Sequence, residues 1–555
     1  AEFLRSFADA VSGHRLLLVL TARPGSAATV LPPIPETIAL GGLEDDERRR
    51  MVLTLLDAQS TSDDLLQAVL SKAEGNPLYV EEIVRQLQET GGVVVENGHA
   101  TLKTADLKVP ATIHDIIAAR VDRLGEHLKA TLQPAAVIGR QFAVPVLAGV
   151  LETPGELSVD LSDLYALDLI FPGEPAPEPV YSFKHALTQD VVYDSLLLRK
   201  RRQFHGAVGA VLEERFADRV QEFVELLAYH FEHSDNVEKA VDYGIRAGEK
   251  AQRRWANLEA LAHFEAALAR LESLPDTEQN RLRRIDAIVK QAEVKFALGR
   301  HAEHIEALEG IRGLVEAIKD PPRQAAWYGW AGFLHSLTGS PPEVPISYCR
   351  RALEIAEASN LEEYSAFAQC SLTHVSVVAG DLRGAVEAGT RALRLFEGQG
   401  NLWWASRTLW GLSMAFNCIG EWRHSMECCR KGLEYGQTMK DQRLKVVGLF
   451  RTGSTHILRG DPEAGLKFCE EALALSLPFD TAMIKAVRAL GLAKAGDATA
   501  GIADMLEAIA WFERSKLRYT RSVVALWLAE TYLHQGARAD ARALIDDVLA
   551  TSREI

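Results

Sequence analysis

The chain has 555 residues, of which 47% are hydrophobic and 25% are charged. These values are ordinary for a folded globular protein and exclude a wholly disordered one. Acidic residues number 76 against 61 basic ones, and the net charge of −15 argues against a broad surface for nucleic acid or for an anionic membrane. No apolar stretch reaches about 18 residues, so the sequence predicts no transmembrane helix.

The N-terminal 40 residues contain one short apolar run, LLLVL at 16–20. Continuous apolar runs of this length are typical of a strand buried on both faces of a parallel sheet. Pro24 and Gly25 end the run. No initiator Met and no signal peptide precede it, so we expect the chain to begin inside a domain, as a cut or processed fragment.

Residues 41–108 are predicted to form a small helical domain, with two or three helices between 43 and 91. Asn76 followed by Pro77 is a good helix start, because Asn caps free backbone N–H groups and Pro at the first position loses no hydrogen bond. The helix that follows is expected to end at Gly91-Gly92.

Residues 109–203 are predicted to form a compact mixed unit. Helices are expected near 111–124, 128–138, 144–152, 158–167 and 185–198. Two short strands at 169–171 and 181–183 flank the turn GEPAPEP, a pattern typical of the wing of a winged helix. The basic cluster Arg199–Arg202 is interpreted as cations at a helix C-terminus, with DNA contact as the alternative.

From residue 204 to 555 the sequence predicts paired helices with regularly spaced turns. Glycines that would end one helix and open the next recur at intervals of 40, 41, 40, 40, 36 and 40 residues. They are Gly299, Gly339, Gly380, Gly420, Gly460, Gly496 and Gly536. Because neither helix of such a pair buries its face alone, this spacing predicts an α-solenoid.

Two further positions follow several of these glycines. A small residue five positions after the glycine (+5) would let the second helix approach the first: Ala385, Ser425, Gly465, Gly501 and Ala541. An aliphatic residue at +13 is expected to fill the core between the helices: Leu393, Leu433, Leu473, Ile509 and Leu549.

The segments 377–396 and 456–475 resemble tetratricopeptide-type repeats in a longer variant of about 40 residues, whereas the standard repeat has about 34. The N-terminal half resembles the back half of a STAND-class (AAA-related) ATPase. LLLVLTARP looks like its sensor strand, AEGNPLYVEEIVRQLQETG like its lid, and the stretch from VPATIHDII to YSFKHALTQDVVYDSLL like its winged helix. This order is similar to the C-terminal half of bacterial adenylate/guanylate cyclase-domain signalling proteins.

The resemblance implies a mainly α fold with a partial α/β ATPase remnant at 1–40, a lid at 41–108, a winged helix at 109–203 and a tetratricopeptide-like solenoid at 204–555. The phosphate loop G-x-x-x-x-G-K-[ST] is missing, and so is the acidic Walker-B strand. We therefore expect ATP or ADP with Mg²⁺ only in a longer parent protein, and no cofactor, metal or catalytic residue in this chain alone.

Four residues are the candidate nucleotide contacts that the resemblance implies: Arg23, Gly75, Pro77 and His185. Arg23 would reach a phosphate from the end of the sensor strand, or is a solvated loop residue. Pro77 would pack on adenine beside Gly75, or only begins a helix. His185, where the second wing strand meets a helix, would contact a diphosphate, although a structural role is favoured.

Several other residues have structural interpretations. The pairs His230/His233 and His301/His304 lack the further ligands that zinc needs, so we interpret them as surface or packing residues. The aromatic residues are expected in the solenoid core, or on a concave peptide-binding surface: Trp327, Tyr328, Trp330, Trp403 and Trp404. The six cysteines form no C-x-x-C pair and are expected as reduced core residues in the cytoplasm.

The expected function is that of a regulatory half. A protein or small-molecule effector would bind the repeat array and, through the upstream ATPase, switch a linked nucleotidyl cyclase. Two alternatives remain open: a protein-interaction scaffold without nucleotide function, and a STAND-class transcription activator. We expect no membrane partner and no nucleic-acid partner.

Overall fold

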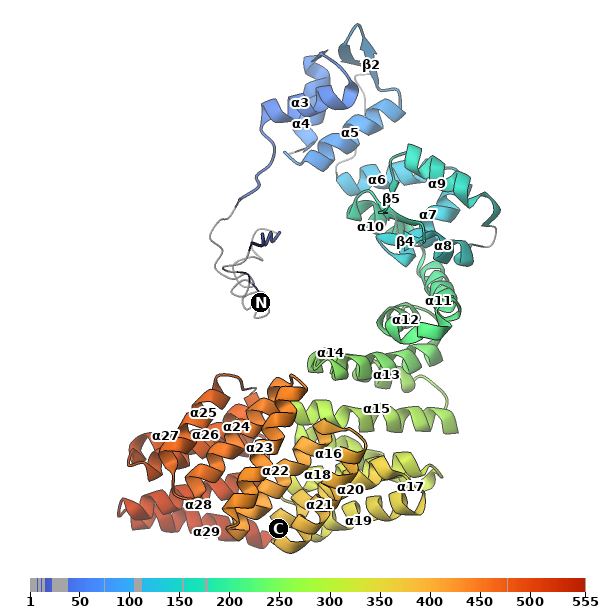
Figure 1. The fold of residues 1–555 in the computed structure, drawn as a ribbon. Helices are drawn as coiled ribbons and strands as arrows, with labels where there is room; N and C mark the ends of the chain where they lie inside the picture. The colour runs from blue at the N-terminus through green and yellow to red at the C-terminus, as the bar shows by residue number, and fades with distance from the viewer. Residues whose placement is uncertain are drawn as a thin grey trace. The chain divides into compact units, whose positions relative to one another are not determined.

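A computed structural model describes residues 7, 11, 15–21, 38–73, 75–103, 112–151, 154–174, 178–476 and 478–554 (Figure 1). The chain divides into two compact units, residues 1–198 and 199–555, which are described separately below.

The first half of the N-terminal unit packs three helices beside a small sheet. The helices are α3 (Asp45–Leu56), α4 (Asp63–Ala73) and α5 (Pro77–Glu89). The strands are β1 (Ser60–Thr61), β2 (Val93–Glu96) and β3 (His99–Leu102), in the order β1-β3-β2. The predicted helix start is confirmed, since the Asn76 side chain accepts a hydrogen bond of 3.0 Å from the Leu78 N–H and Pro77 is the first helical residue.

The hairpin of β2 and β3 was not predicted, although the sequence carries a signal for it. Asn97 and Gly98 join the two strands with φ angles of 52° and 77°. Asn and Gly tolerate this left-handed conformation, and an Asn-Gly pair between apolar runs is a strong signal for a tight hairpin turn. The pairing of Glu96 with His99 leaves only these two residues in the turn.

The second half of the N-terminal unit contains six helices around one sheet. The helices are α6 (Ile113–Asp122), α7 (Glu126–Ile138), α8 (Val144–Val150), the 3-10 helix η1 (Pro154–Glu156), α9 (Leu157–Ala166) and α10 (Ala186–Ser195). The strands β4 (Gln141–Ala143), β5 (Ile170–Pro172) and β6 (Val180–Phe183) are all antiparallel, in the order β4-β6-β5. The predicted pair of strands on either side of the Pro-rich turn is therefore confirmed.

Residues 16–20 do not form the predicted buried strand. They adopt no regular secondary structure, and the Leu17 side chain is 89% exposed. A strand of a parallel sheet needs hydrogen-bonded neighbours, and no strand of the described residues pairs with this segment. The assignment of residues 1–40 to an ATPase core stays a prediction.

The interpretation of the basic cluster as a helix C-terminus is wrong. Helix α10 ends at Ser195, and Arg199–Arg202 lies in the first turns of the next helix, α11 (Leu198–Arg215). The partial positive charge of a helix N-terminus does not favour cations there. The second compact unit begins at Arg199, close to the predicted boundary at 203/204.

The C-terminal unit is helical throughout its described residues. Its first helices are α11, η2 (Ala217–Glu222), α12 (Val224–Glu232), α13 (Val237–Arg253), α14 (Asn257–Leu271), α15 (Glu278–Ala297), α16 (His301–Gly310), α17 (Arg312–Ala317), α18 (Pro321–Thr338) and α19 (Glu343–Ala358). The rest are α20 (Glu362–Val378), α21 (Leu382–Gly398), α22 (Leu402–Ile419), α23 (Trp422–Thr438), α24 (Gln442–Leu458), α25 (Pro462–Leu473), α26 (Pro478–Lys494), α27 (Ala498–Arg514), α28 (Arg518–His534) and α29 (Arg538–Glu554).

The seven predicted glycine turns are confirmed. Each glycine has a positive φ, from 74° at Gly299 to 105° at Gly496, and each joins the two helices of one pair. Glycine adopts this backbone conformation without the steric cost that a Cβ atom brings.

The small residues at +5 are also confirmed as points of close approach. A Cβ atom on Gly465 would lie 2.7 Å from the Gly453 carbonyl oxygen, and one on Gly501 would lie 2.7 Å from the Ala489 carbonyl oxygen. The expectation for +13 is confirmed in four of the five repeats, since Ile509 is buried in the core and Leu393, Leu433 and Leu473 are half-buried against it. Leu549 departs from it and is 49% exposed. The residue one position earlier is buried in each repeat, at Ala392, Gly432, Ala472, Ala508 and Val548.

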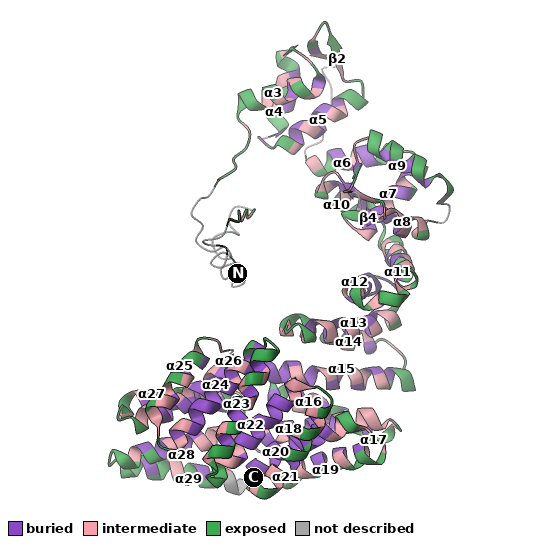
Figure 2. Ribbon diagram, viewed as in Figure 1, coloured by how far each residue is buried: buried purple, intermediate pink, exposed green. Residues whose placement is uncertain are grey.

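The first helices of successive pairs form an inner layer. Helices α18, α20, α22, α24, α26 and α28 each pack on the next of this series, and α18 also packs on α28. The array therefore completes a turn, and its inner helices surround a central space that we call the lumen. Figure 2 shows that burial is concentrated along these inner helices. No described helix is long and apolar enough to cross a membrane.

Candidate functional site

The predicted nucleotide contacts lie in or before the N-terminal unit. Arg23 lies outside the described residues. Gly75 has a φ of 79°, its carbonyl oxygen accepts a 2.7 Å hydrogen bond from the Leu43 N–H, and a Cβ atom on it would lie 3.0 Å from Gly42 Cα. Gly75 is thus needed for a close approach within the chain itself. Pro77 is exposed at the start of α5.

His185 caps the start of α10 and faces the helix that Pro77 begins. Its Nε2 atom lies 3.9 Å from a carboxylate oxygen of Glu81 on α5. This nitrogen is buried and makes no hydrogen bond with the described residues. Burial lowers the pKa of the imidazole, against the opposing field of Glu81. The imidazole is therefore held near neutrality, where it has a free position for a hydrogen bond.

A charged network joins α5 to β5 and β6 beside this histidine. Lys184 contacts Glu81 at 2.6 Å and also pairs with Asp168, while Arg85 contacts Glu81 at 3.1 Å and also pairs with Asp168. These pairs fix α5 against the segment that contains β5 and β6, and they position His185 beside that contact.

In the C-terminal unit the lumen is lined by aromatic side chains. A pocket of about 240 Å³ lies at its mouth. Its aromatic lining is Trp330, Tyr364, Phe367, Phe396 and Trp404, and its charged lining is Glu249, Lys290, Glu293 and Glu363. Two cavities of about 10 Å³ each lie deeper, and both are lined by Arg407 and Trp410.

Three arginines of the inner helices α22 and α24 are buried, and two of them, Arg407 and Arg443, line the small cavities. Arg407, Arg443 and Arg451 are 6%, 9% and 8% exposed. The Arg407 guanidinium lies 4.2 Å from the ring centre of Trp403, and that of Arg451 lies 4.8 Å from Trp410, both at cation–π distance. Burial lowers the pKa of Arg407 to about 10 and that of Arg451 to about 9.

Carboxylates compensate these charges only in part. Arg443 lies 3.6 Å from Asp480, and burial raises the pKa of that acid. Glu293, whose pKa is also raised by burial, accepts a 2.9 Å hydrogen bond from Gln252. Within the described residues no carboxylate lies within 4.0 Å of Arg407 or Arg451. Two buried cations of the inner helices therefore have no ion-pair partner among the described residues, and one of them, Arg407, lines both small cavities.

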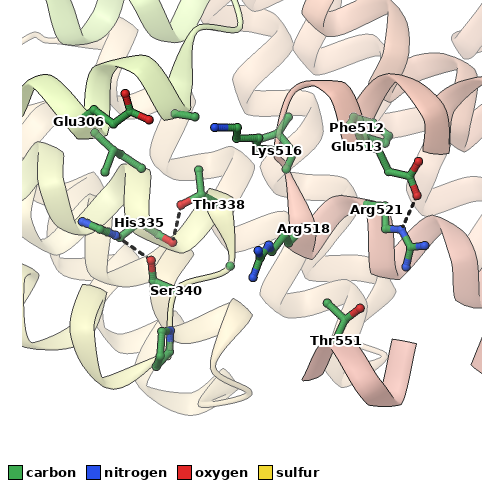
Figure 3. A pocket seen from close by; sticks show the side chains of 15 residues that line it. Glu306, His335, Thr338, Ser340, Phe512, Glu513, Lys516, Arg518, Arg521 and Thr551 are labelled. Carbon is green, nitrogen blue, oxygen red and sulfur yellow. Dashed lines mark hydrogen bonds and ion pairs between the residues drawn. The ribbon is translucent and has the colours of Figure 1, made fainter. Parts of the chain in front are cut away.

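A larger pocket, of about 750 Å³, lies where the last inner helix meets α18 (Figure 3). We call it the seam pocket. It is bounded by the α18–α19 turn on one side and the α27–α28 turn on the other. The His335 ring is fixed by hydrogen bonds to Ser340 at 2.7 Å and Glu309 at 2.9 Å, whereas Lys516 and Arg518 point into open space.

The other predicted residues are structural. Trp327 is fully buried and its indole N–H donates to the Leu308 carbonyl oxygen at 2.9 Å. His230, His301 and His304 are fully buried packing residues, while His233 is exposed. The lumen arginines were not predicted. A signal was available for Arg407, since it stands four residues after Trp403 and thus shares its helix face.

Sequence comparisons find two similarities. Residues 44–101, from the start of α3 to β3, match a family described as a domain of unknown function (DUF8739). The chain is also 26% identical over 276 residues to an uncharacterized protein of Rhizobium meliloti (strain 1021). That match covers 48% of this chain and 26% of the relative, so the chain spans about a quarter of the length of this curated relative.

Solved structures support the fold. A signal transduction ATPase with numerous domains (STAND) from Pyrococcus horikoshii, with a tetratricopeptide repeat sensor, matches 92% of this chain and 72% of its own length, with a TM-score of 0.52 and 11% identity. A Rap protein complexed with competence and sporulation factor matches 62% of this chain and 98% of its own, with a TM-score of 0.50 and 11% identity. The C-terminal unit is thus a tetratricopeptide-like helical repeat.

Proposed function

We propose that this chain is the sensing half of a nucleotide-switched signalling ATPase, whose repeat array binds an effector in its lumen. The observation that carries the proposal is the pair of buried arginines, Arg407 and Arg451, that stack on Trp403 and Trp410 without an ion-pair partner among the described residues. Arg407 also lines both small cavities. Residues needed only for folding are selected for pairing or for apolar packing, so these side chains are better explained by a ligand.

The structural relatives support the same function. The repeats of the Pyrococcus horikoshii protein are described as a sensor, and the Rap protein was solved in complex with competence and sporulation factor. By analogy, the lumen of this array would receive a protein segment or a small molecule.

The N-terminal unit would carry the signal. Winged-helix and lid domains are our interpretation of its two halves, and the network of Glu81, Arg85, Asp168 and Lys184 would hold them in one arrangement. An effector that favours one of two arrangements shifts the population between them. The output would be a linked class III adenylate/guanylate cyclase in the parent protein.

Nucleotide contact in this chain would involve His185 and Pro77. The orphaned Nε2 of His185 fits a contact with a diphosphate oxygen, but the sequence has no phosphate loop. These residues alone therefore do not make up a site for ATP or ADP with Mg²⁺. The phosphate-binding residues would lie in another part of the longer parent protein.

Hydrogen exchange on the full chain tests effector sensing. The probe is a low-molecular-mass extract of cells that carry the gene, added to and withheld from the purified protein. We expect slower exchange in α20, α22 and α24, which line the lumen. Protection confined to outer helices such as α21 and α23, or none at all, would favour the protein-interaction scaffold.

The nucleotide part needs a separate test. ADP and ATP are titrated against a polypeptide that extends upstream of Ala1 by the natural sequence, and against its His185→Ala variant. We expect binding that weakens in the variant. Absence of any nucleotide binding would refute the proposed nucleotide switch, but it would leave the proposal of effector sensing unaffected.

A further inference from the structure

We propose that the effector is held by a carboxylate group, which enters the lumen and accepts hydrogen bonds from Arg407 and its neighbours on α22 and α24. This inference rests on the proposed function, because it names the chemical class of the effector that the array senses.

The first argument is a set of buried donors that lack acceptors. Five side-chain atoms on α22 and α24 are inaccessible and have no hydrogen-bond partner among the described residues. They are Trp403 Nε1, Trp410 Nε1, Arg443 Nη1, Arg451 Nε and Arg451 Nη2. Native proteins rarely leave such groups unpaired. Since all five atoms donate, the missing partner is an acceptor.

The second argument is charge. The lumen places three guanidinium groups near two carboxyl groups, and Arg451 has only Cys418, Cys429 and Tyr519 as titratable neighbours that favour its charge. Buried charges in stable proteins are paired. An anionic acceptor would supply both the charge and the hydrogen bonds that are missing.

The third argument is size. The two inner cavities share Arg407 and Trp410, and each has a volume of about 10 Å³, room for about one oxygen-sized group. One of them shares Phe367 and Trp404 with the 240 Å³ pocket at the mouth. One oxygen of a carboxylate fills such a cavity and accepts a charge-assisted hydrogen bond from Arg407 there. The second oxygen and the body of the ligand would lie outside, among the mouth aromatics.

The mouth disfavours a polyanion. Glu249 pairs with Lys290, whereas Glu363 is exposed and has no cation partner within 4.0 Å among the described residues. Its carboxylate would repel a nucleotide or a polyphosphate and would tolerate a neutral or cationic ligand body. The site therefore favours the C-terminal carboxylate of a short peptide or a small aromatic monocarboxylic acid.

Binding is tested with matched probes on the full chain. One arm uses a pool of hexapeptides with free C-termini and the same pool amidated, with retained peptides identified by mass spectrometry. The other arm titrates phenylacetate and phenylacetamide, read by tryptophan fluorescence. We expect the free carboxylates to bind in at least one arm and the amides to bind about 10- to 100-fold more weakly. The arm that binds identifies the source of the carboxylate.

The variant Arg407→Gln should weaken the same binding by about 10- to 100-fold. Its control is Arg430→Gln, since Arg430 pairs with Glu427 and Glu434 on the exposed side of α23 and should leave binding unchanged. Equal binding of acids and amides, equal binding by Arg407→Gln, or no binding of any carboxylate would overturn the inference. Protection of the lumen by the cell extract would then still support an effector of another class.

A ligand-free measurement tests the same inference. If the charge of Arg451 is unpaired until an anionic ligand binds, Arg451→Met removes a destabilising buried cation. We then expect the Tm of the ligand-free protein to rise by about 1–3 °C. A fall in Tm would show that its stacking on Trp410 and Phe450 is structural, and would overturn the inference even if the array is a sensor.

Discussion

Arg120 in the N-terminal unit and Arg451 in the C-terminal unit are buried to nearly the same degree, at 6% and 8% exposure, but their surroundings differ. Arg120 contacts Glu82 at 3.3 Å and Glu89 at 2.9 Å and donates to the Leu167 carbonyl oxygen. Arg451 has no carboxylate within 4.0 Å among the described residues. Burial alone thus does not distinguish an arginine with a structural role from a candidate ligand-binding arginine. The presence or absence of a carboxylate partner does.

The largest expected effect is the loss of the structural pair. Arg120→Ala leaves Glu82, with its side chain 3% exposed, as an uncompensated buried charge. We expect the free energy of unfolding of the N-terminal unit to fall by about 3–5 kcal/mol. Hydrogen exchange in α5 and α6 measures it. All nine tryptophans lie between residues 255 and 527, so tryptophan fluorescence reports on the repeats and should not change.

The control is Arg123→Ala. Arg123 is 41% exposed and also contacts Glu89, at 3.1 Å, so its removal should cost at most about 1 kcal/mol. If the two variants had equal effects, the buried pair would not be what holds α5 to α6.

The second prediction concerns the stability of the repeat array at acid pH, where a buried histidine must take up a proton on unfolding. Burial lowers the pKa of His374 in the repeat array to about 4. Between pH 6.5 and about 4 the unfolded chain binds a proton that the folded chain does not, so stability is lost as pH falls. The loss is up to about 3 kcal/mol for this residue. Arg407 and Arg451, which lie near it, add to the shift, whereas Asp480 and Glu293, whose pKa values are raised, act in the opposite sense.

Urea unfolding at pH 7 and pH 5, followed by tryptophan fluorescence, measures this loss in the repeats. His374→Gln should remove only part of the pH dependence, because burial also lowers the pKa values of His230, His301 and His304 in the same array. A midpoint in wild type that does not move between these two pH values would refute the assignment of His374 as a buried neutral imidazole.

The third prediction concerns how closely the helices approach in each pair. Gly465→Ala would place a Cβ atom 2.5 Å from Ile457 and 2.7 Å from the Gly453 carbonyl oxygen, so we expect a loss of about 1–3 kcal/mol. Gly432→Ala meets its nearest atom at an ordinary 3.6 Å and should gain up to about 1 kcal/mol through helix propensity. Denaturant midpoints compare the two variants, and a stable Gly465→Ala would contradict the packing described for +5.

The repeat spacing and the glycine turns could be predicted because the sequence repeats them, and each requires a positive φ at a fixed interval. The +13 positions could be predicted for the same reason, and Leu393, Leu433 and Leu473 pack on the core. The buried small residues at +12, such as Ala392 and Gly432, were not predicted, because small side chains give a weak hydrophobic signal. The lumen arginines could not be identified as buried, because burial depends on how the array closes on itself, and that closure is a property of the tertiary structure.

The smallest expected effect is at the seam pocket. It tests whether unpaired cations that are exposed to water also bind the effector, as the buried arginines of the lumen are proposed to do. Lys516 and Arg518 are exposed, so water solvates their charge and neither needs an anion. Lys516→Ala should change the free energy of unfolding by no more than about 0.5 kcal/mol and should leave carboxylate binding at its wild-type level. Denaturant midpoints and the phenylacetate titration check both expectations. A loss of binding in this variant would move the effector from the lumen to the seam, since the two sites share no lining residue.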